Sequence, residues 1–159
     1  MGFRGEISQV LTRKIITSSI AGSLFAILLG LFVPNPFGED ISSIGVYFQG
    51  FVISVPVYLM YSFPVILLYG TITSTISDYV ARVISNYTNR NFKLYFSIIL
   101  HILFGLILLW YSLLASFLYF ITDYILSKRG TYKWNNALKS IGIPALVWIL
   151  FMWSVYIIG

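Results

Sequence analysis

The stretch VYFQGFVISVPVYLMYSFPVILLYGTITSTISDY, residues 46–79, decides the fold class of this chain. It falls within a longer segment, residues 41–77, in which no side chain carries a formal charge. A membrane-spanning helix needs about 20 predominantly apolar residues, so this segment is long enough to cross a bilayer. Pro56 and Pro64 interrupt it, and membrane helices tolerate such breaks where neighbouring groups satisfy the freed carbonyls. The stretch therefore predicts a long, kinked membrane helix.

The composition of the whole chain points to the same environment. Hydrophobic residues make up 58% and charged residues only 9% of the 159 positions, whereas soluble globular proteins contain about 25% charged residues. So few charged side chains cannot cover the surface of a water-soluble fold. Cysteine is absent, which excludes disulfides, thiolate metal ligands and a cysteine nucleophile.

The formal charge of +5 is typical of a membrane protein with basic loops in the cytoplasm. Such loops face anionic lipid headgroups, so the expected partner is a lipid bilayer with anionic headgroups. Nucleic acid is a poor alternative, because no stretch combines dense Lys and Arg with soluble structure.

Uncharged runs separated by polar segments predict an all-α polytopic integral membrane protein with one four-helix transmembrane domain, residues 1–159. The basic N-terminal segment 1–14 precedes the first helix. The expected transmembrane helices are residues 15–33, 51–77, 94–122 and 141–158, and the main connections are a polar loop, 78–93, and an interfacial aromatic and basic loop, 124–139.

Two sets of small residues suggest helix-packing faces. The first set recurs every four residues in the first helix, and the second shares a face of the second helix. These candidates are Ser18, Gly22, Ala26 and Gly30 in the first set, and Gly70 and Ser74 in the second. The alternative is that small residues are simply common in membrane helices.

Three ionisable residues are candidates for polar positions within the membrane or at its edge: Asp78, His101 and Asp123. Asp78 also stands four residues before Arg82, the spacing of a surface ion pair on a helix. A metal site needs several ligands, and His101 has neither a second histidine nor a cysteine to join it. We expect His101 to bond a hydroxyl or carbonyl group, although a functional role for an intramembrane histidine remains an alternative.

A catalytic site is not expected from these residues. Ser74, His101 and Asp78 are the types found in a Ser–His–Asp hydrolase, but no nucleophile motif such as G-x-S-x-G is present. The sequence also lacks phosphate-binding and dinucleotide-binding motifs. We therefore expect no catalytic residue, no cofactor and no metal.

The distribution of basic residues favours a cytoplasmic N-terminus. With four crossings, however, Lys128, Arg129, Lys133 and Lys139 would lie outside. A hairpin over residues 94–127 would place all the basic residues inside, but we disfavour it because its two legs would be very short. A second explanation is that the acidic pair at residues 39–40 lies against these four cations.

Residues 61–80, YSFPVILLYGTITSTISDYV, carry Pro64, Tyr69-Gly70, Ser74 and Asp78 in an aromatic- and isoleucine-rich setting. In this the stretch resembles the small uncharacterised multi-helix membrane proteins of Bacillus-type Gram-positive bacteria. The resemblance implies a multi-pass protein of the cell membrane, and it implies no activity.

Together these features predict a non-enzymatic accessory or interaction protein that acts through helix–helix contacts, either as a homo-oligomer or with another membrane protein. A small transporter or pore component, working as an oligomer, is the alternative, because Pro-interrupted helices with nearby hydroxyls expose backbone to substrates in transporters. An intramembrane enzyme is the third possibility.

Overall fold

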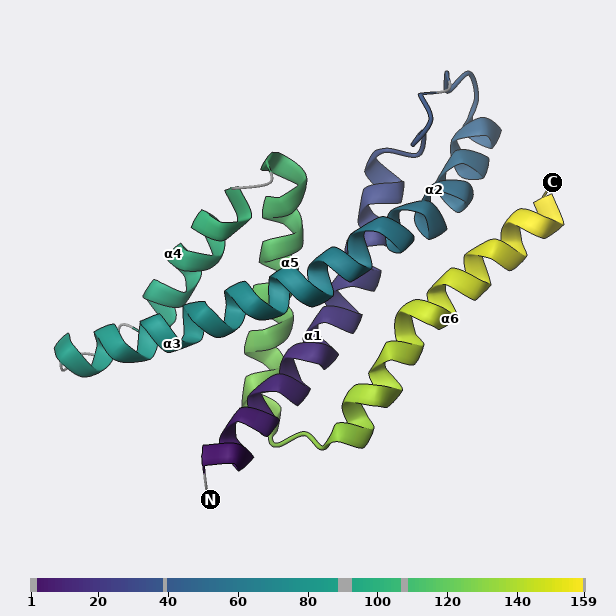
Figure 1. The fold of residues 1–159 in the computed structure, drawn as a ribbon. Coiled ribbons are helices and arrows are strands. Elements are labelled where there is room, and N and C mark those ends of the chain that lie inside the picture. The colour runs from purple at the N-terminus through teal and green to yellow at the C-terminus, as the bar shows by residue number, and fades with distance from the viewer. Residues whose placement is uncertain (1–2, 39, 89–92, 107–108, 159) are drawn as a thin grey trace.

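The computed structural model describes residues 3–38, 40–88, 93–106 and 109–158, and the regular elements in these ranges are all helices (Figure 1). The all-α expectation is thereby confirmed. In chain order the elements are α1 (Phe3–Phe32), α2 (Ile44–Val65), the π-helical η1 (Ile66–Gly70), α3 (Thr71–Thr88), α4 (Lys93–Leu106), α5 (Leu109–Arg129) and α6 (Trp134–Ile158).

Helix α1 is the centre of the bundle and packs against α2, α3, α5 and α6. It can approach α2 closely because small residues line the contact. A Cβ atom at Gly30 would lie 2.8 Å from both Ser54 Oγ and Val55 Cγ2, and one at Gly22 would lie 3.1 Å from the Phe63 ring.

The end of α1 is closed by tyrosines of α2. The last carbonyls of a helix have no partner within it, and the membrane interior offers no water to replace one. The Tyr58 hydroxyl donates to the Val33 carbonyl at 2.8 Å, and the Tyr47 hydroxyl donates to the Leu31 carbonyl. These bonds fix the turn between α1 and α2.

The stretch 46–79 lies in a single helical rod, residues 44–88, in which α2, η1 and α3 follow one another without a break. Pro56 and Pro64 lie inside α2, and the π-helical segment begins two residues after Pro64. Proline cannot donate the usual backbone hydrogen bond, and a π-helical segment is one way for a helix to accommodate the disturbance. The rod is longer than the expected span of 51–77 at both ends.

The expected polar loop 78–93 is largely wrong, because residues 78–88 continue α3. Its centre, residues 89–92, lies outside the described residues. Asp78 falls in the middle of a helix, where its side chain is directed towards other elements. Charge alone marked this segment as a loop, but a charged residue inside a bundle can remain helical when a partner neutralises it.

The expected single crossing at residues 94–122 is also wrong. The segment forms two helices, α4 and α5, which run in opposite directions and pack on each other (Figure 1). The Ser116 hydroxyl on α5 donates to the His101 carbonyl on α4 at 2.6 Å. An uncharged run of this length suits one long crossing or two shorter helices equally well, and the contacts of these helices with the rest of the bundle select the second arrangement.

The expected interfacial loop 124–139 is too long. Helix α5 continues to Arg129 and α6 begins at Trp134, so only residues 130–133 form a turn. Gly130 has a φ of 130°, a conformation that side chains disfavour and glycine permits. The indole of Trp134 donates to Ser8 Oγ at 2.8 Å, so this turn is attached to the first turns of α1.

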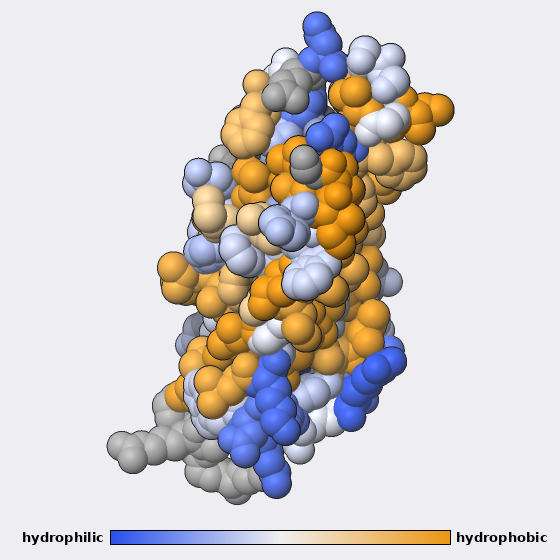
Figure 2. Space-filling model, turned by 90° about the vertical axis from the view of Figure 1, so that its right-hand side faces the viewer, coloured by the Kyte–Doolittle hydropathy of each residue, from blue (hydrophilic) through white to orange (hydrophobic). Residues whose placement is uncertain are grey.

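Three helices in the described residues are long and apolar enough to cross a membrane: Ile7–Phe32, Ile44–Ile84 and Trp134–Ile158. The surface that contains α6 shows a broad apolar belt with hydrophilic residues towards both ends (Figure 2). This distribution is the one expected for a protein surrounded by lipid. The expectation of four crossings is not confirmed: in the described residues three helices reach membrane length, and residues 94–122 are divided between α4 and α5.

We expect Gly30→Ala to lower the free energy of unfolding by about 1–3 kcal/mol, because the added methyl group must push Ser54 and Val55 away. Unfolding of the detergent-solubilised protein by increasing SDS, followed by circular dichroism, measures the change. Gly142→Ala on α6 is the matched control, since nothing lies within 4 Å of its added methyl group. Equal stability of the two variants would contradict the close α1–α2 contact.

Candidate functional site

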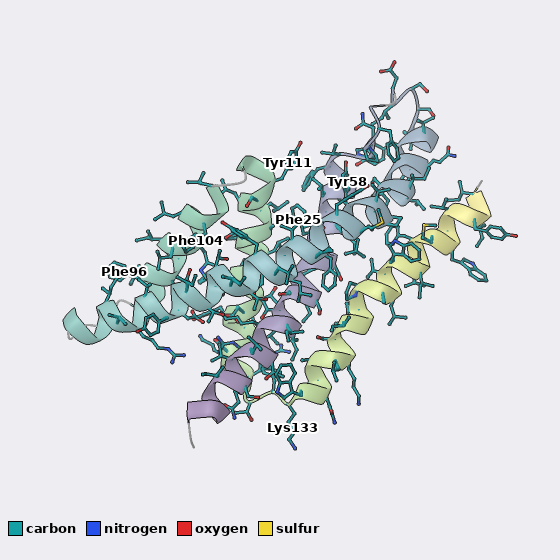
Figure 3. All side chains as sticks on the ribbon, in the orientation of Figure 1. Phe25, Tyr58, Phe96, Phe104, Tyr111 and Lys133 are labelled. Atoms are coloured by element: carbon teal, nitrogen blue, oxygen red, sulfur yellow. The ribbon has the colours of Figure 1, made fainter. Side chains whose placement is uncertain are left out.

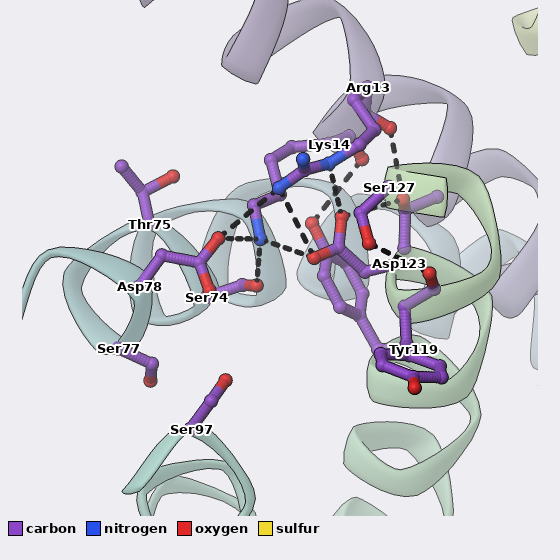
Figure 4. A network of polar contacts seen from close by, with 12 residues as sticks. Arg13, Lys14, Ser74, Thr75, Ser77, Asp78, Ser97, Tyr119, Asp123 and Ser127 are labelled. Atoms are coloured by element: carbon purple, nitrogen blue, oxygen red, sulfur yellow. Dashed lines mark hydrogen bonds and ion pairs between the residues drawn. The ribbon is translucent and has the colours of Figure 1, made fainter. Parts of the chain in front are cut away.

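Four charged side chains from three helices meet inside the bundle (Figure 4). Lys14, on α1, lies at the centre of this charge cluster. Its ammonium nitrogen is 2.8 Å from Asp78 Oδ2 on α3 and 2.8 Å from Asp123 Oδ2 on α5. The Lys14 ammonium therefore links the rod formed by α2, η1 and α3 to the hairpin formed by α4 and α5.

Arg13, the neighbouring residue on α1, joins the same two carboxylates. Its Nε donates to Asp123 Oδ1 at 2.9 Å, and its Nη2 lies 3.3 Å from Asp78 Oδ2. A guanidinium presents several donors in a fixed plane, so it can serve two acids at once. Each aspartate is thus shared by two cations.

The cluster is buried and formally neutral. The side chain of Lys14 is fully buried, while those of Arg13, Asp78 and Asp123 keep between 11% and 18% of their exposure. Removing a charge from water is costly, and only a well-placed opposite charge and hydrogen bonds offset that cost. Two cations and two anions balance, so the cluster can lie among apolar helices.

Hydroxyl groups complete the coordination of the charges. Thr17 Oγ1 donates to Asp123 Oδ1 at 3.3 Å, and the Tyr119 hydroxyl donates to the Lys14 carbonyl at 3.3 Å. Ser18 also donates to the Lys14 carbonyl, at 2.9 Å, and lies 3.1 Å from Thr71 Oγ1. These bonds orient the α1 turn that carries the two cations.

A chain of hydrogen bonds leads from the cluster to the histidine. Lys14 Nζ donates to Ser74 Oγ at 2.5 Å, and Ser74 Oγ lies 3.2 Å from His101 Nε2. The other ring nitrogen, Nδ1, is 2.8 Å from the Ser97 carbonyl. Since a carbonyl only accepts, Nδ1 carries a proton, and in a neutral ring Nε2 would then accept from the Ser74 hydroxyl.

The serine–histidine contact is not completed by Asp78 to a Ser–His–Asp triad. Ser74 is fully buried, so an external substrate has no access to its hydroxyl. Asp78 binds Lys14 and Arg13, and the group that orients His101 is the Ser97 carbonyl. Within the described residues no group of three or more His, Cys, Asp or Glu side chains is placed to hold a metal ion.

The structure brings several of the sequence candidates together. Asp78, Asp123 and Ser74 contact Lys14, and His101 contacts Ser74. The remaining candidates lie at helix contacts: Ser18 and Ala26 are fully buried, Gly22 and Gly30 pack against α2, and Gly70 lies beneath the Tyr119 ring.

Arg13 and Lys14 are the members of the cluster that sequence reasoning missed, because they were assigned to the basic segment before the first helix. A signal was present. Lys14 stands four residues before Ser18, so it extends the spacing of the small-residue stripe by one step. A lysine on the packing face of a membrane helix requires an acidic partner.

Two expected ion pairs are absent from this arrangement. Asp78 pairs with α1 residues and not with Arg82, its neighbour on the helix surface. The turn that holds Asp40 lies at the opposite end of the bundle from residues 128–133, so Asp40 does not meet those cations (Figure 1). Glu39, the other expected acid, lies outside the described residues.

The three membrane-length helices, the apolar belt and the buried neutral charge cluster define the class of this chain: an all-helical membrane protein with an internal ionic network. Comparison with protein-family models, with curated proteins and with solved structures finds no match.

We expect Lys14→Met to lower the free energy of unfolding by about 3–5 kcal/mol, because two buried carboxylates are left with one cation. The double variant Lys14→Met, Asp78→Leu restores charge balance and should recover most of the loss. SDS unfolding of the two single variants and the double variant gives the coupling energy. Lys139→Met, at an exposed position on α6, is the control and should have little effect. Strictly additive losses would refute the cluster.

Proposed function

We propose that the chain is a non-enzymatic, multi-pass protein of the cell membrane with a cytoplasmic N-terminus, and that it acts through contacts with another membrane-embedded chain. The observation that carries the proposal is the closed charge cluster. Its ionisable groups pair with one another between three helices, which favours a structural role for them over a catalytic one. The resemblance of residues 61–80 to small Gram-positive membrane proteins supports the cell membrane as the location.

The orientation is supported by the hairpin. Arg13 and Arg82 line one hollow together with residues 130–132, so α1, α3 and the α5–α6 turn meet at the same end. Lys128, Arg129 and Lys133 flank that turn and are exposed. Positive charge gathers on the cytoplasmic side of membrane proteins, and this end suits anionic headgroups there. The four basic residues that a four-crossing chain would place outside are then inside.

Labelling of single introduced cysteines tests this orientation, since the chain has no cysteine of its own. We expect cysteines near the N-terminus and at Thr131 to be protected from an impermeant maleimide in intact cells. Cysteines at Phe37 and after Gly159 should react. Reaction of both Thr131→Cys and Phe37→Cys from outside the cell would contradict the orientation. A four-crossing chain would give that result, with the C-terminal cysteine protected.

The proposed contact surface is α6, which lies at the outer edge of the bundle and packs on α1 and α2 (Figure 1). In the apolar stretch of α6 that is long enough to cross a membrane, only 6% is buried, compared with 56% in the corresponding stretch of α1. Large side chains such as Ile149, Trp153 and Tyr156 are exposed along it. An aromatic-rich helix of this kind offers a large rigid surface to a neighbouring membrane helix.

We expect a photoreactive group attached at Ile149→Cys on α6 to cross-link to protein in native membranes. The matched control is Ile72→Cys on α3, where the isoleucine is exposed to a similar degree. A product of twice the chain mass identifies a second copy, and a product of another mass identifies a different membrane protein. Adducts with lipid alone at both positions would remove the proposed contact.

Transport by an oligomer is the second candidate, and η1 favours it. π-Helical segments are frequent at functional sites, and this one lies within a Pro-interrupted rod beside the chain that links Lys14, Ser74 and His101. Proton or solute flux in vesicles reconstituted with the protein, lost on His101→Ala, would establish transport in place of the accessory role.

A further inference from the structure

The bundle contains a cavity of about 440 Å³ that is lined by residues of α1, α2, η1, α3, α4 and α5. Pockets for small molecules range from about 300 to 1,000 Å³, so this space suits a single small ligand and is too small for a protein segment. Aromatic side chains line much of it, and four of them are labelled in Figure 3: Phe25, Tyr58, Phe104 and Tyr111.

The lining is apolar and carries no formal charge. Its described residues are aromatic, aliphatic, glycine, serine and threonine, with His101 as the one basic side chain. The ring of His101 is hydrogen-bonded to the Ser97 carbonyl and to Ser74, which also accepts from Lys14 of the charge cluster. A charged ligand would find no counter-ion here, and burying an unpaired charge is costly. The cavity therefore favours an uncharged molecule.

One polar group in the cavity lacks a partner. Ser62 lines the space, and its hydroxyl is buried without a hydrogen bond to any described residue. A buried unsatisfied hydroxyl is destabilising, and it can both donate and accept. By contrast, the hydroxyls of Tyr58 and Ser116 are engaged with backbone carbonyls. Because no hydrogen bond holds it, the Ser62 side chain can rotate about its Cα–Cβ bond and turn its buried hydroxyl towards one hydroxyl or carbonyl group of a ligand.

The cavity opens sideways into the region expected to face lipid. Tyr61 and Tyr111 line it and remain 69% and 59% exposed, so its mouth lies between α2 and α5. The π-helical segment contributes Ile66, Tyr69 and Gly70 to the wall, and the absence of a side chain at Gly70 lets the Tyr119 ring pack against the segment, since a Cβ atom there would lie 3.0 Å from that ring. A ligand would enter from the bilayer and not from water.

We propose that this cavity binds a neutral single-chain amphiphile, with a hydrocarbon chain among the aromatic residues and a hydroxyl or carbonyl group on Ser62. The apolar, uncharged lining favours the hydrocarbon chain of the ligand. The unpaired hydroxyl selects the polar group, and the sideways opening selects a molecule that partitions into lipid. This site is independent of the proposed α6 contact, so either can fail without the other.

Photolabelling with a diazirine-bearing hexadecanol, of the protein in nanodiscs, tests the site. We expect labelled peptides from α2 and α5, and unlabelled hexadecanol should compete for them. Ser112→Phe fills the cavity and should abolish this labelling, whereas the matched change Ser154→Phe on α6, outside the cavity, should not. Labelling confined to the outer surface of α6, or unchanged in Ser112→Phe, would overturn the proposal.

The conservative variant Ser62→Ala separates the role of the hydroxyl from folding, because it removes a group that forms no hydrogen bond in the described protein. It should weaken competition by hexadecanol about three- to tenfold, the loss of one hydrogen bond. Competition by hexadecane should not change. Equal effects on the alcohol and the alkane would show that Ser62 does not bind the polar group, and the proposal would fail even if Ser112→Phe were unstable.

Discussion

The structure depends on the neutralisation of buried charge. Lys14 is fully buried and lies 2.8 Å from a carboxylate on each of two other helices. In a bilayer a lysine without such partners would be strongly destabilising, and so would either aspartate. The requirement for pairing brings α1, α3 and α5 together at one level of the bundle. It also fixes the rotation of each helix, because the paired side chains must face one another.

This constraint explains why the hairpin forms. If residues 94–122 were a single crossing, Asp123 would lie at the far side of the membrane from Arg13. Folding the segment back on itself returns Asp123 to the end where α1 begins, 2.9 Å from Arg13 Nε. The same reversal places residues 128–133 beside the first turns of α1, where Trp134 bonds Ser8. The reversal between α4 and α5 therefore both pairs Asp123 with Arg13 and places the basic residues of 128–133 at the same end as the start of α1.

The cluster and the cavity lie next to each other and share His101. The side chain reaches Ser74, and through it Lys14, while the ring also forms part of the cavity wall. Tyr119 has a similar double position, since its hydroxyl bonds the Lys14 carbonyl and its ring lines the cavity. The ionic network therefore supports the part of the cavity wall formed by His101 and Tyr119, while the Pro-interrupted helix and η1 supply other parts of the wall.

The sequence by itself indicated a membrane environment and an all-helical class for this protein, but not where its helices begin and end. An uncharged segment as long as residues 41–77 has to be helical in lipid, because its peptide groups can bond only within the segment. Spacing also placed Ser18, Gly22 and Gly30 on one face, and Gly70, Ser74 and Asp78 on another. The tertiary structure alone decided that residues 94–122 turn back and that Arg13 and Lys14 belong to the interior. A helix pattern reports which residues share a face, but the partner of a charge on that face may lie a hundred residues away, and only packing brings the two together.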